Sequence, residues 1–360
     1  MYKEITEGQV KIQIPKETKV SRKLPVFYNP AMKLNRDISI LLLNATKQTQ
    51  FNIILPLAGT GVRGVRFLKE LKRGKLKTIT FNDISPTAIK HVQDNVENNN
   101  IKNSKIKTNN KENNENKNKI TYENDYADQF LLKASCMNYI DIDPFGSPTP
   151  FLDAAVKKIL SPGILAITAT DTSSLAGTYP NVCRRRYWAT PKKGPEMHEI
   201  GLRILIRKVQ LIGTQYEKAL IPIFSYSKDH YMRAFFKVER GKKKCTEIVK
   251  QHKMYKEAGP LWMGSLWDTT LVKNMIKENK KAKLIDPLLL ETIYDEANID
   301  GVGFHDIHAL CKTRSPVPRF TKLITALEKK KYAVSRTHFN QYGLKVNIEE
   351  HKLLEIISKL

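Results

Sequence analysis

The sequence predicts an α/β fold, in which a domain with a mostly parallel sheet precedes a smaller α+β domain. Strand-like apolar runs alternate with helical patterns from residue 51 to about residue 240. A glycine-rich turn follows the first run, and an acid ends the second. Beyond the lysine-rich residues 241–244, the pattern becomes richer in helix. We therefore expect a first domain over residues 1–240, with helices on both faces of its sheet, and a second over residues 241–360.

The composition limits the class of protein. The chain has 360 residues, of which 41% are hydrophobic, and this is enough apolar material for two domains. No apolar run approaches the ~20 residues that cross a bilayer, and the first residues lack a signal-peptide pattern. The four cysteines lie far apart without a C-x-x-C pair, which argues against disulfides and a structural zinc site. We therefore expect a cytoplasmic protein with no membrane contact, no metal and no obligate protein partner.

The charge points to a polyanionic partner. The chain carries 61 Lys and Arg against 36 Asp and Glu, a formal net charge of +25. Such a field attracts nucleic acid, and no isolated basic amphipathic helix favours a membrane instead. Three consecutive arginines, Arg184, Arg185 and Arg186, precede a Tyr and a Trp. Arginines beside aromatic rings suit RNA binding, although a solvated helix end explains the same pattern.

The first elements read as follows along the chain. A proline-punctuated loop at residues 24–30 precedes a helix over residues 35–43, for which Asn35 or Asp37 is the start signal. The sheet then begins with alternating strands and helices. Strands are predicted over residues 51–55 and 77–81, and helices over residues 65–71 and 86–97.

An insertion and further strand–helix units follow. Residues 98–119 are rich in Asn and Lys and poor in apolar side chains, which predicts a mobile surface insertion. The later elements follow the same alternation. Strands are predicted over residues 138–143, 163–169, 219–225 and 231–238, and helices over residues 149–160 and 198–216.

The turn after the first strand is a candidate cofactor site. Gly59 and Gly61 allow the backbone to approach a ligand closely, and the next helix begins there. The second strand ends at Asp83, where an acid in a doubly wound fold accepts the ribose hydroxyls of a nucleotide. A simple helix cap at Asp83 is the alternative reading.

Two cofactor classes, hydride carriers and S-adenosylmethionine, fit this pair of signals, and three features favour the methyl donor. The last two predicted strands form a closing antiparallel pair that suits methyltransferases. Another strand ends in Asp-Pro-Phe, where amino-methyltransferases hold their target amine. Arg63, within the turn, can pair with the methionine carboxylate of the donor. We therefore expect a Rossmann-like, S-adenosylmethionine-dependent methyltransferase domain.

Residues 141–148 (DIDPFGSP) are the candidate acceptor site. Asp143 can accept a hydrogen bond from an exocyclic amine, while Pro144 stiffens the turn and exposes carbonyl acceptors. Phe145 offers a face on which a base stacks. Asp141 points to the same side of its strand and supports Asp143 or acts as a secondary proton acceptor. The alternative is a strand that merely ends in a Pro-Gly turn.

These motifs together resemble a known family, the archaeal tRNA guanine-26 N2-dimethyltransferases. The resemblance runs along nearly the whole chain in separate blocks. They are residues 26–30 (VFYNP), 35–37 (NRD), 60–64 (TGVRG), 82–84 (NDI), 141–148 (DIDPFGSP), 168–171 (TATD), 198–201 (HEIG), 228–231 (KDHY), 259–262 (GPLW) and 336–339 (RTHF).

The resemblance implies roles for particular residues. It places donor contacts at Arg36, Arg63 and Asp83, and the target guanine at residues 143–145. Where relatives hold the adenine of the donor with an acidic-Ala-Asn triplet, this chain reads DYAD at residues 125–128. The adenine contact is therefore expected at Asp125 or at the backbone of Tyr126 and Ala127. Some relatives carry paired cysteines in the second domain, whereas this chain has Cys245 and Cys311 far apart there, so no metal is expected.

The implied function is the transfer of one or two methyl groups from S-adenosylmethionine to N2 of guanine 26 in tRNA. The second domain, rich in lysine, is expected to contact the tRNA. Two alternatives stay open at this point: methylation of DNA or another amino group, and a non-catalytic RNA-binding protein on a methyltransferase scaffold.

Overall fold

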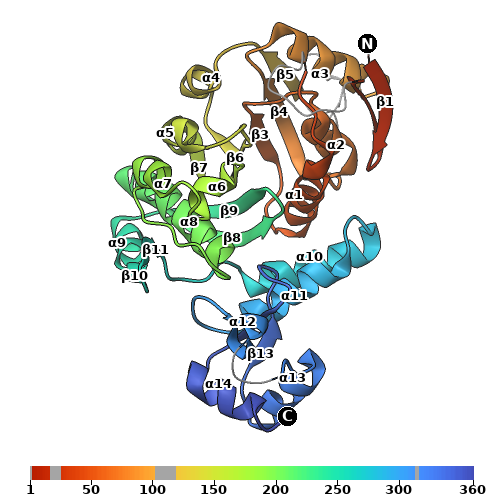
Figure 1. The fold of residues 1–360 in the computed structure, drawn as a ribbon. Coiled ribbons are helices and arrows are strands. Elements are labelled where there is room, and N and C mark those ends of the chain that lie inside the picture. The colour runs from red at the N-terminus through yellow and green to blue at the C-terminus, as the bar shows by residue number, and fades with distance from the viewer. Residues whose placement is uncertain (1, 17–25, 102–118, 313–315) are drawn as a thin grey trace, which may run out of the picture.

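A computed structural model describes residues 2–16, 26–101, 119–312 and 316–360 (Figure 1). Its centre is a seven-stranded sheet in the order β5-β4-β3-β6-β7-β9-β8. Strands β3 to β7 are parallel, and β9 runs antiparallel to both of its neighbours. The strands are β3 (Phe51–Leu55), β4 (Leu76–Asn82), β5 (Lys119–Glu123), β6 (Met137–Ile142), β7 (Ile159–Ala169), β8 (Lys218–Lys228) and β9 (Tyr231–Arg240).

The predicted α/β class is confirmed, and β8 and β9 form the predicted antiparallel pair. The Asn- and Lys-rich insertion falls mostly on residues 102–118, which lie outside the described residues.

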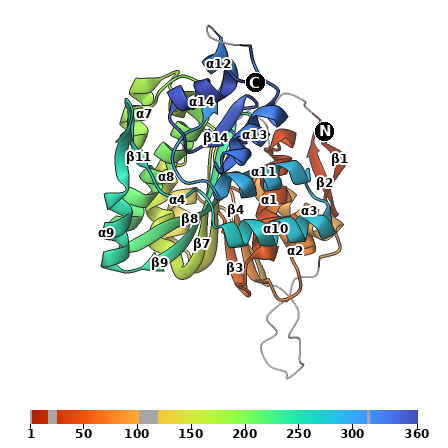
Figure 2. The same cartoon turned by 90° about the horizontal axis from the view of Figure 1, so that it is seen from below.

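Helices cover both faces of the sheet (Figure 2). Helices α1 to α3 lie on one face, where α2 packs against both α1 and α3, and α4, α5 and α8 form the layer on the other (Figure 1). Two short helices, α6 and α7, precede α8. The bounds are α1 (Lys33–Ala45), α2 (Val62–Glu70), α3 (Pro86–Asn98), α4 (Ala127–Lys133), α5 (Leu152–Lys158), α6 (Thr172–Leu175), α7 (Pro180–Tyr187) and α8 (Met197–Gln215), with a 3-10 turn η2 (Thr149–Phe151) before α5.

Helix α1 begins earlier than predicted, so neither Asn35 nor Asp37 is its start signal. A 3-10 turn, η1 (Pro30–Met32), leads into the helix, and the Asn29 side chain accepts the Ala31 N–H at 3.0 Å. Both Asn35 and Asp37 are buried one turn inside α1. Their side chains therefore serve contacts beneath the cavity rather than the free N–H groups of a helix end.

An N-terminal hairpin packs beside these helices. Its strands are β1 (Tyr2–Glu7) and β2 (Val10–Pro15), which pair antiparallel in register. Strand β2 contacts α2 and α3, and its apolar side chains Val10, Ile12 and Ile14 join the main core. The hairpin thereby carries Glu7 into the interior, where it is 2% exposed.

The C-terminal part contains mixed helix and strand. The first of its elements pack on the sheet domain: α9 on α8, β11 on α8, and α10 on α1. The elements are α9 (Lys242–Lys250), β10 (His252–Tyr255), β11 (Ala258–Trp262), α10 (Thr269–Ala282), α11 (Pro287–Ala297), β12 (His305–Asp306), α12 (Ile307–Cys311), α13 (Phe320–Lys329), β13 (Val334–Arg336), β14 (Gly343–Val346) and α14 (Glu350–Ile357).

The described residues form two apolar cores. The larger one includes the sheet and reaches Ile293, Phe304 and Phe339. The smaller one lies within residues 307–357, around the antiparallel sheet β12-β14-β13. The division of the chain at about residue 240 stays a prediction. Among the described residues, no helix combines the length and the apolar character needed to cross a bilayer.

Candidate active site at the carboxyl ends of the parallel strands

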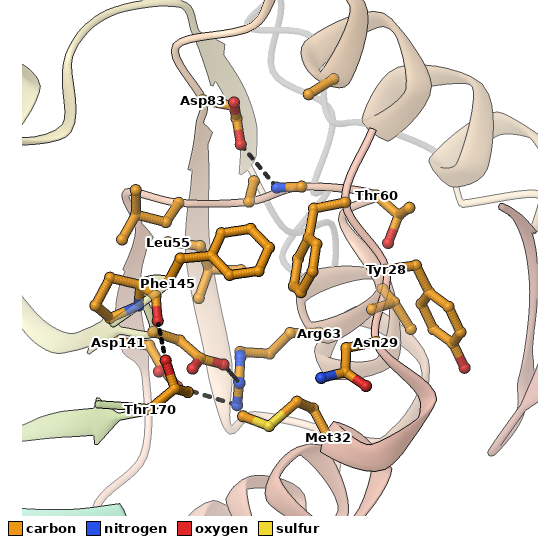
Figure 3. Close-up of a pocket in the computed structure, with 18 of the residues that line it drawn as sticks. Tyr28, Asn29, Met32, Leu55, Thr60, Arg63, Asp83, Asp141, Phe145 and Thr170 are labelled. Atoms are coloured by element: carbon orange, nitrogen blue, oxygen red, sulfur yellow. Dashed lines mark hydrogen bonds and ion pairs between the residues drawn. The ribbon is translucent and has the colours of Figure 1, made fainter. Parts of the chain in front are cut away.

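A cavity of about 630 Å³ opens where the central parallel strands end (Figure 3). Its volume falls in the range of small-molecule sites, roughly 300–1,000 Å³. The carboxyl ends of parallel strands meet at one edge of the sheet, so residues distant in sequence converge there. Of the predicted site residues, the walls include Arg36, Gly59, Arg63, Asp83, Asp141, Asp143, Pro144 and Phe145.

The glycine turn between β3 and α2 forms one wall. Gly59 and Gly61 have φ angles of +54° and +74°, which side chains rarely adopt. A Cβ on Gly59 would lie 2.8 Å from the carbonyl oxygen of Phe27, and Thr60 donates its N–H to that same oxygen at 3.2 Å. The segment at residues 26–29 therefore lies directly across the turn, and Gly59 is required for that approach.

Asp83 fastens the glycine turn to the end of β4. Its Oδ2 accepts the N–H of Gly59 at 2.9 Å, and its Oδ1 accepts the N–H of Ser85 at 3.0 Å. The cap of helix α3 is Ser85, whose hydroxyl accepts the N–H of Ala88 at 3.3 Å. Asp83 is thus more than a helix cap, because it joins two loops at the edge of the cavity.

The acid turn after β6 forms the opposite wall. Asp143 faces the cavity with 21% of its side chain exposed, and its carboxylate binds the guanidinium of Arg63. Among the described residues, Arg63 is its ion-pair partner. The same guanidinium lies 3.4 Å from Asp141 and donates to Ser39 Oγ at 3.0 Å. Arg63 therefore joins the two acids of the motif.

Asp141 lies beneath the cavity and is buried. Arg233 donates to both carboxylate oxygens at 2.7 Å, and Tyr139 donates its hydroxyl at 2.8 Å. Burial alone would raise the pKa of Asp141, but the charges of Arg233 and Arg63 outweigh it and lower that pKa. Asp141 is consequently a weak proton acceptor, and the geometry fits the supporting role.

Two aromatic rings meet inside the cavity. Phe145 is 39% exposed, and its ring centroid lies 4.0 Å from that of Phe27 at 66°. Thr170, at the end of β7, holds the turn behind Phe145. Its hydroxyl accepts the N–H of Gly146 at 2.6 Å, while its own N–H donates to the Gly146 carbonyl at 2.9 Å.

Arg36 reaches the cavity from α1 and is held by the N-terminal hairpin. Its Nε and Nη2 donate to the two carboxylate oxygens of Glu7, each at 2.6 Å. Burial alone would raise the pKa of Glu7, but the hydrogen bonds and charge of Arg36, together with Arg66, lower it to about 2. Glu7 was not predicted, because an acid in an alternating strand gives no sign of a partner 29 residues away.

Some predicted residues lie outside the cavity walls, among them Gly61, which packs against Val92 of α3. Asp125, Tyr126 and Ala127 follow β5, and Asp125 pairs with Lys133 at 2.6 Å. The main chain of Asp125 is tied to the Asn82 side chain, by bonds of 3.0 and 3.1 Å, and thus to the end of β4. The exposed residues Arg184, Arg185 and Arg186 form the last turn of α7, away from the cavity.

The cavity also includes residues that sequence reasoning did not select. Ile84 is 56% exposed beside Asp83, and Thr170 lies behind the acid turn. Each lies within a block quoted for the family resemblance, residues 82–84 and 168–171, but no site role was predicted for either. In the part of the chain that the structure describes, no three His, Cys, Asp or Glu side chains are grouped to hold a metal ion.

The sheet order, the glycine turn with Asp83, and the acid turn beside it define a Rossmann-like methyltransferase. A family model described as N2,N2-dimethylguanosine tRNA methyltransferase matches residues 8–257 and 247–358. The chain belongs to this family. The predicted membership is confirmed, and the enzyme is a tRNA methyltransferase that depends on S-adenosylmethionine.

Individual relatives match over their full length. A tRNA (guanine(26)-N(2))-dimethyltransferase of Methanococcus maripaludis strain C7 is 35% identical, over 99% of this chain and 98% of its own. The Methanocaldococcus jannaschii protein of the same description is 34% identical, with 98% of each chain covered. Trm1 from Pyrococcus horikoshii, solved in complex with S-adenosyl-L-methionine, is 32% identical, with a TM-score of 0.85 and 99% of each chain covered.

Proposed function

We propose that this enzyme transfers one or two methyl groups from S-adenosylmethionine to N2 of guanine 26 in tRNA. The observation that carries the proposal is that the glycine turn with Asp83 and the acid turn with Asp143 line one cavity. A donor and a flat amine can therefore be held side by side. The family, and the donor complex of the Pyrococcus horikoshii relative, support this assignment.

The donor half of the cavity matches the chemistry of S-adenosylmethionine, which supplies an activated methyl group on a positively charged sulfur. Asp83 provides a carboxylate for the ribose hydroxyls, and Ile84 and Ala88 provide apolar contact for the adenine. Arg36 and Arg63 provide the positive charge for the methionine carboxylate. The proposal keeps the adenine contact at residues 125–127, since Asn82 ties them to the strand that ends at Asp83.

The acceptor half uses Asp143 and its neighbours. Arg63 binds one side of the Asp143 carboxylate, and the other oxygen accepts a hydrogen from the guanine amine. This hydrogen bond orients the nitrogen lone pair towards the methyl group, so that alignment contributes most of the catalysis. A carbonyl at Pro144 accepts the second amine hydrogen. After the transfer the methylated nitrogen is cationic and acidic, so its proton passes by way of the Asp143 carboxylate to water, and no strong base is required.

Phe145 stacks on the guanine. Its ring now touches Phe27 at a centroid distance of 4.0 Å, which leaves no room for a base between the two rings. A base can therefore enter between the two rings only if one ring turns aside. The base must also leave its stack in the tRNA, at a cost of a few kcal/mol.

Contacts to the tRNA backbone offset that cost. The exposed arginines at the end of α7 are the proposed phosphate contacts, and the lysine-rich C-terminal part holds the tRNA body. The net charge of +25 supports both contacts. We further propose that the enzyme is cytoplasmic and acts without an obligate protein partner. Its four cysteines are free, which agrees with a reducing compartment.

Nucleoside mass spectrometry of tRNA, after incubation with enzyme and donor, tests this function. We expect N2-methylguanosine and N2,N2-dimethylguanosine, both lost when guanine 26 is replaced by adenine. Methylation of duplex DNA, or of a different ring position, would assign the enzyme to another class of amino-methyltransferase. Tight tRNA binding without any methylation would instead favour the non-catalytic RNA-binding protein.

A further inference from the structure

The hydroxyl of Tyr187 joins three parts of the molecule behind the acid turn. Tyr187 is the last residue of α7 and is fully buried. Its hydroxyl donates to Asp171 Oδ1 at 2.6 Å, and Asp171 follows β7. The same hydroxyl lies 2.9 Å from the hydroxyl of Ser147, in the acid turn.

The donor and the acceptor of each hydrogen bond among these side chains can be assigned. A carboxylate only accepts, so the single proton of Tyr187 goes to Asp171. Burial and the neighbouring Asp171 raise the pKa of Tyr187 well above its usual value, so the hydroxyl remains a donor. Ser147 must then donate to Tyr187, and Thr149, 3.0 Å away, donates to Ser147.

The acid turn is therefore fixed at two consecutive residues. Thr170 holds the backbone of Gly146 by two hydrogen bonds, of 2.6 and 2.9 Å. Tyr187 holds the side chain of Ser147. Phe145 directly precedes this pair and Asp143 lies two residues further back, so both attachments act on the groups proposed to hold the guanine.

The same Asp171 carboxylate also binds the arginine segment. Arg186 donates to its Oδ2 at 3.1 Å, and the Arg186 side chain remains 49% exposed. Asp171 thus accepts one hydrogen bond from the buried end of α7 and one from its exposed face. The acid turn and the proposed phosphate contacts consequently share a single anchor.

We propose that Tyr187 is a positioning residue, which acts through Ser147 to orient Asp143 and Phe145 and joins their turn to the arginine-bearing helix α7. The inference rests on the proposed function, because it concerns how the guanine is held. Tyr187 touches neither substrate in this arrangement. Its effect is on the geometry of the turn rather than on donor or tRNA affinity.

Steady-state methylation of tRNA by Tyr187→Phe tests the proposal. Without the hydroxyl, Ser147 loses its acceptor and the turn loses one attachment, so we expect kcat to fall about tenfold. The KM for tRNA and the donor affinity, measured by calorimetry, stay within about twofold, because Arg186 keeps its own hydrogen bond to Asp171 Oδ2 and Tyr187 makes no donor contact. Tyr255→Phe is the matched control, since Tyr255 donates to Glu196 at 2.7 Å outside the cavity walls. It should keep the parent kcat.

A double-mutant cycle with Ser147→Ala separates positioning from general stabilisation. If Tyr187 acts through Ser147, the double variant has the same kcat as Tyr187→Phe alone. The proposal is overturned if the double variant loses kcat by the product of the two single losses. It is also overturned if Tyr187→Phe keeps the parent kcat. Thermal unfolding shows whether each variant is folded. If Tyr187→Phe does not fold, Ser147→Ala serves as the test, and a parent-like kcat in that variant overturns the proposal. A parent enzyme without methylation would contradict the proposed function instead.

Discussion

At the scale of single residues, Arg63 determines how the acid motif is arranged. The buried Asp141 carboxylate accepts a hydrogen bond from Arg233 at each oxygen, both at 2.7 Å, so it is not free to bind a ligand. Asp143 remains at the cavity surface, with Arg63 on one side. One motif thus contains a structural acid and an acid that faces the ligand, two residues apart.

Replacement of Asp143 by Asn tests the proposed contact with the amine. The amide is nearly isosteric but accepts with only one oxygen and lacks the charge, so we expect methyl transfer to fall by at least ~100-fold. Donor affinity should change little, because the amide oxygen can still accept from Arg63 and the other donor contacts do not involve residue 143. Single-turnover methylation and calorimetric donor titration measure the two quantities.

Asp94→Asn is the control for this change. Asp94 is an exposed acid on α3 that does not line the cavity, so its variant should keep the parent rate. A near-normal rate in Asp143→Asn would remove Asp143 from the proposed chemistry and leave it as a partner for Arg63.

The sequence predicted which kinds of side chain line the cavity but not which of them pair with one another. The strand–turn–helix pattern and the Asp-Pro-Phe motif are local, so Gly59, Asp83 and Asp143 could be selected from short segments. The ion pair of Arg63 with Asp143 joins positions 80 residues apart. Such a contact depends on the order of strands in the sheet, which no local pattern specifies. The pairing of Arg63 with the methionine carboxylate of the donor stays a prediction.

At the scale of elements, the N-terminal hairpin supports the donor half of the cavity. Glu7 binds Arg36 and also lies 3.0 Å from Arg66, a fully buried arginine of α2. The hairpin thereby connects α1 and α2 by charge as well as by apolar packing. Removal of one partner from such a buried group leaves an uncompensated charge, which is strongly destabilising.

The stability of the enzyme should depend on the protonation of Glu7. Its pKa falls from 4.5 to about 2 in the folded state, so the pairing stabilises fully above about pH 4.5 and is lost as the pH falls towards 2. The contribution is roughly 3 kcal/mol. Urea unfolding of Glu7→Gln should therefore show a lower free energy of unfolding at neutral pH and a smaller loss of stability below pH 4.5.

Glu4→Gln provides the comparison within the same hairpin. Glu4 is exposed, pairs with exposed Lys11 at 3.3 Å and accepts a hydrogen bond from Gln13 at 3.4 Å, and exposed contacts of this kind add little stability. Equal pH profiles for Glu7→Gln and the parent would show that the acid-sensitive groups lie elsewhere.

The sequence located six of the seven strands of the sheet and missed β5 at its edge, and the differences in the other strands lie at their ends. Helix α1 begins at Lys33 because a proline-containing turn precedes it, and Asn35 is needed inside, where it donates to Thr168 Oγ1 at 3.2 Å. A polar residue near a helix start reads as a cap when its tertiary partner is unknown. Strands β7 and β8 exceed their predicted lengths, since pairing with neighbours extends them past the apolar stretch.

At the scale of the whole molecule, the net charge of +25 should govern tRNA association. Each phosphate that a Lys or Arg neutralises releases counterions, so affinity falls linearly in log–log form with salt. We expect a loss of at least ~100-fold between 50 and 200 mM salt. Filter binding of tRNA across this range measures the slope.

Arg185→Gln should lower the magnitude of that slope by about one, if Arg185 contacts a phosphate. Among the described residues, Arg184 donates to Thr190 and Asn181 and Arg186 pairs with Asp171, which leaves Arg185 as the member of the α7 triplet with neither kind of contact. A salt-independent affinity would show that the positive charge is incidental to tRNA binding.

The position of β9 between β7 and β8 has a consequence for biosynthesis. During translation, β8 emerges before the strand that must separate it from β7, so it has no place in the sheet until residue 240 has left the ribosome. Until then β7 presents an open edge, a hazard for association between nascent chains. The β8–β9 hairpin therefore covers this edge only late in synthesis.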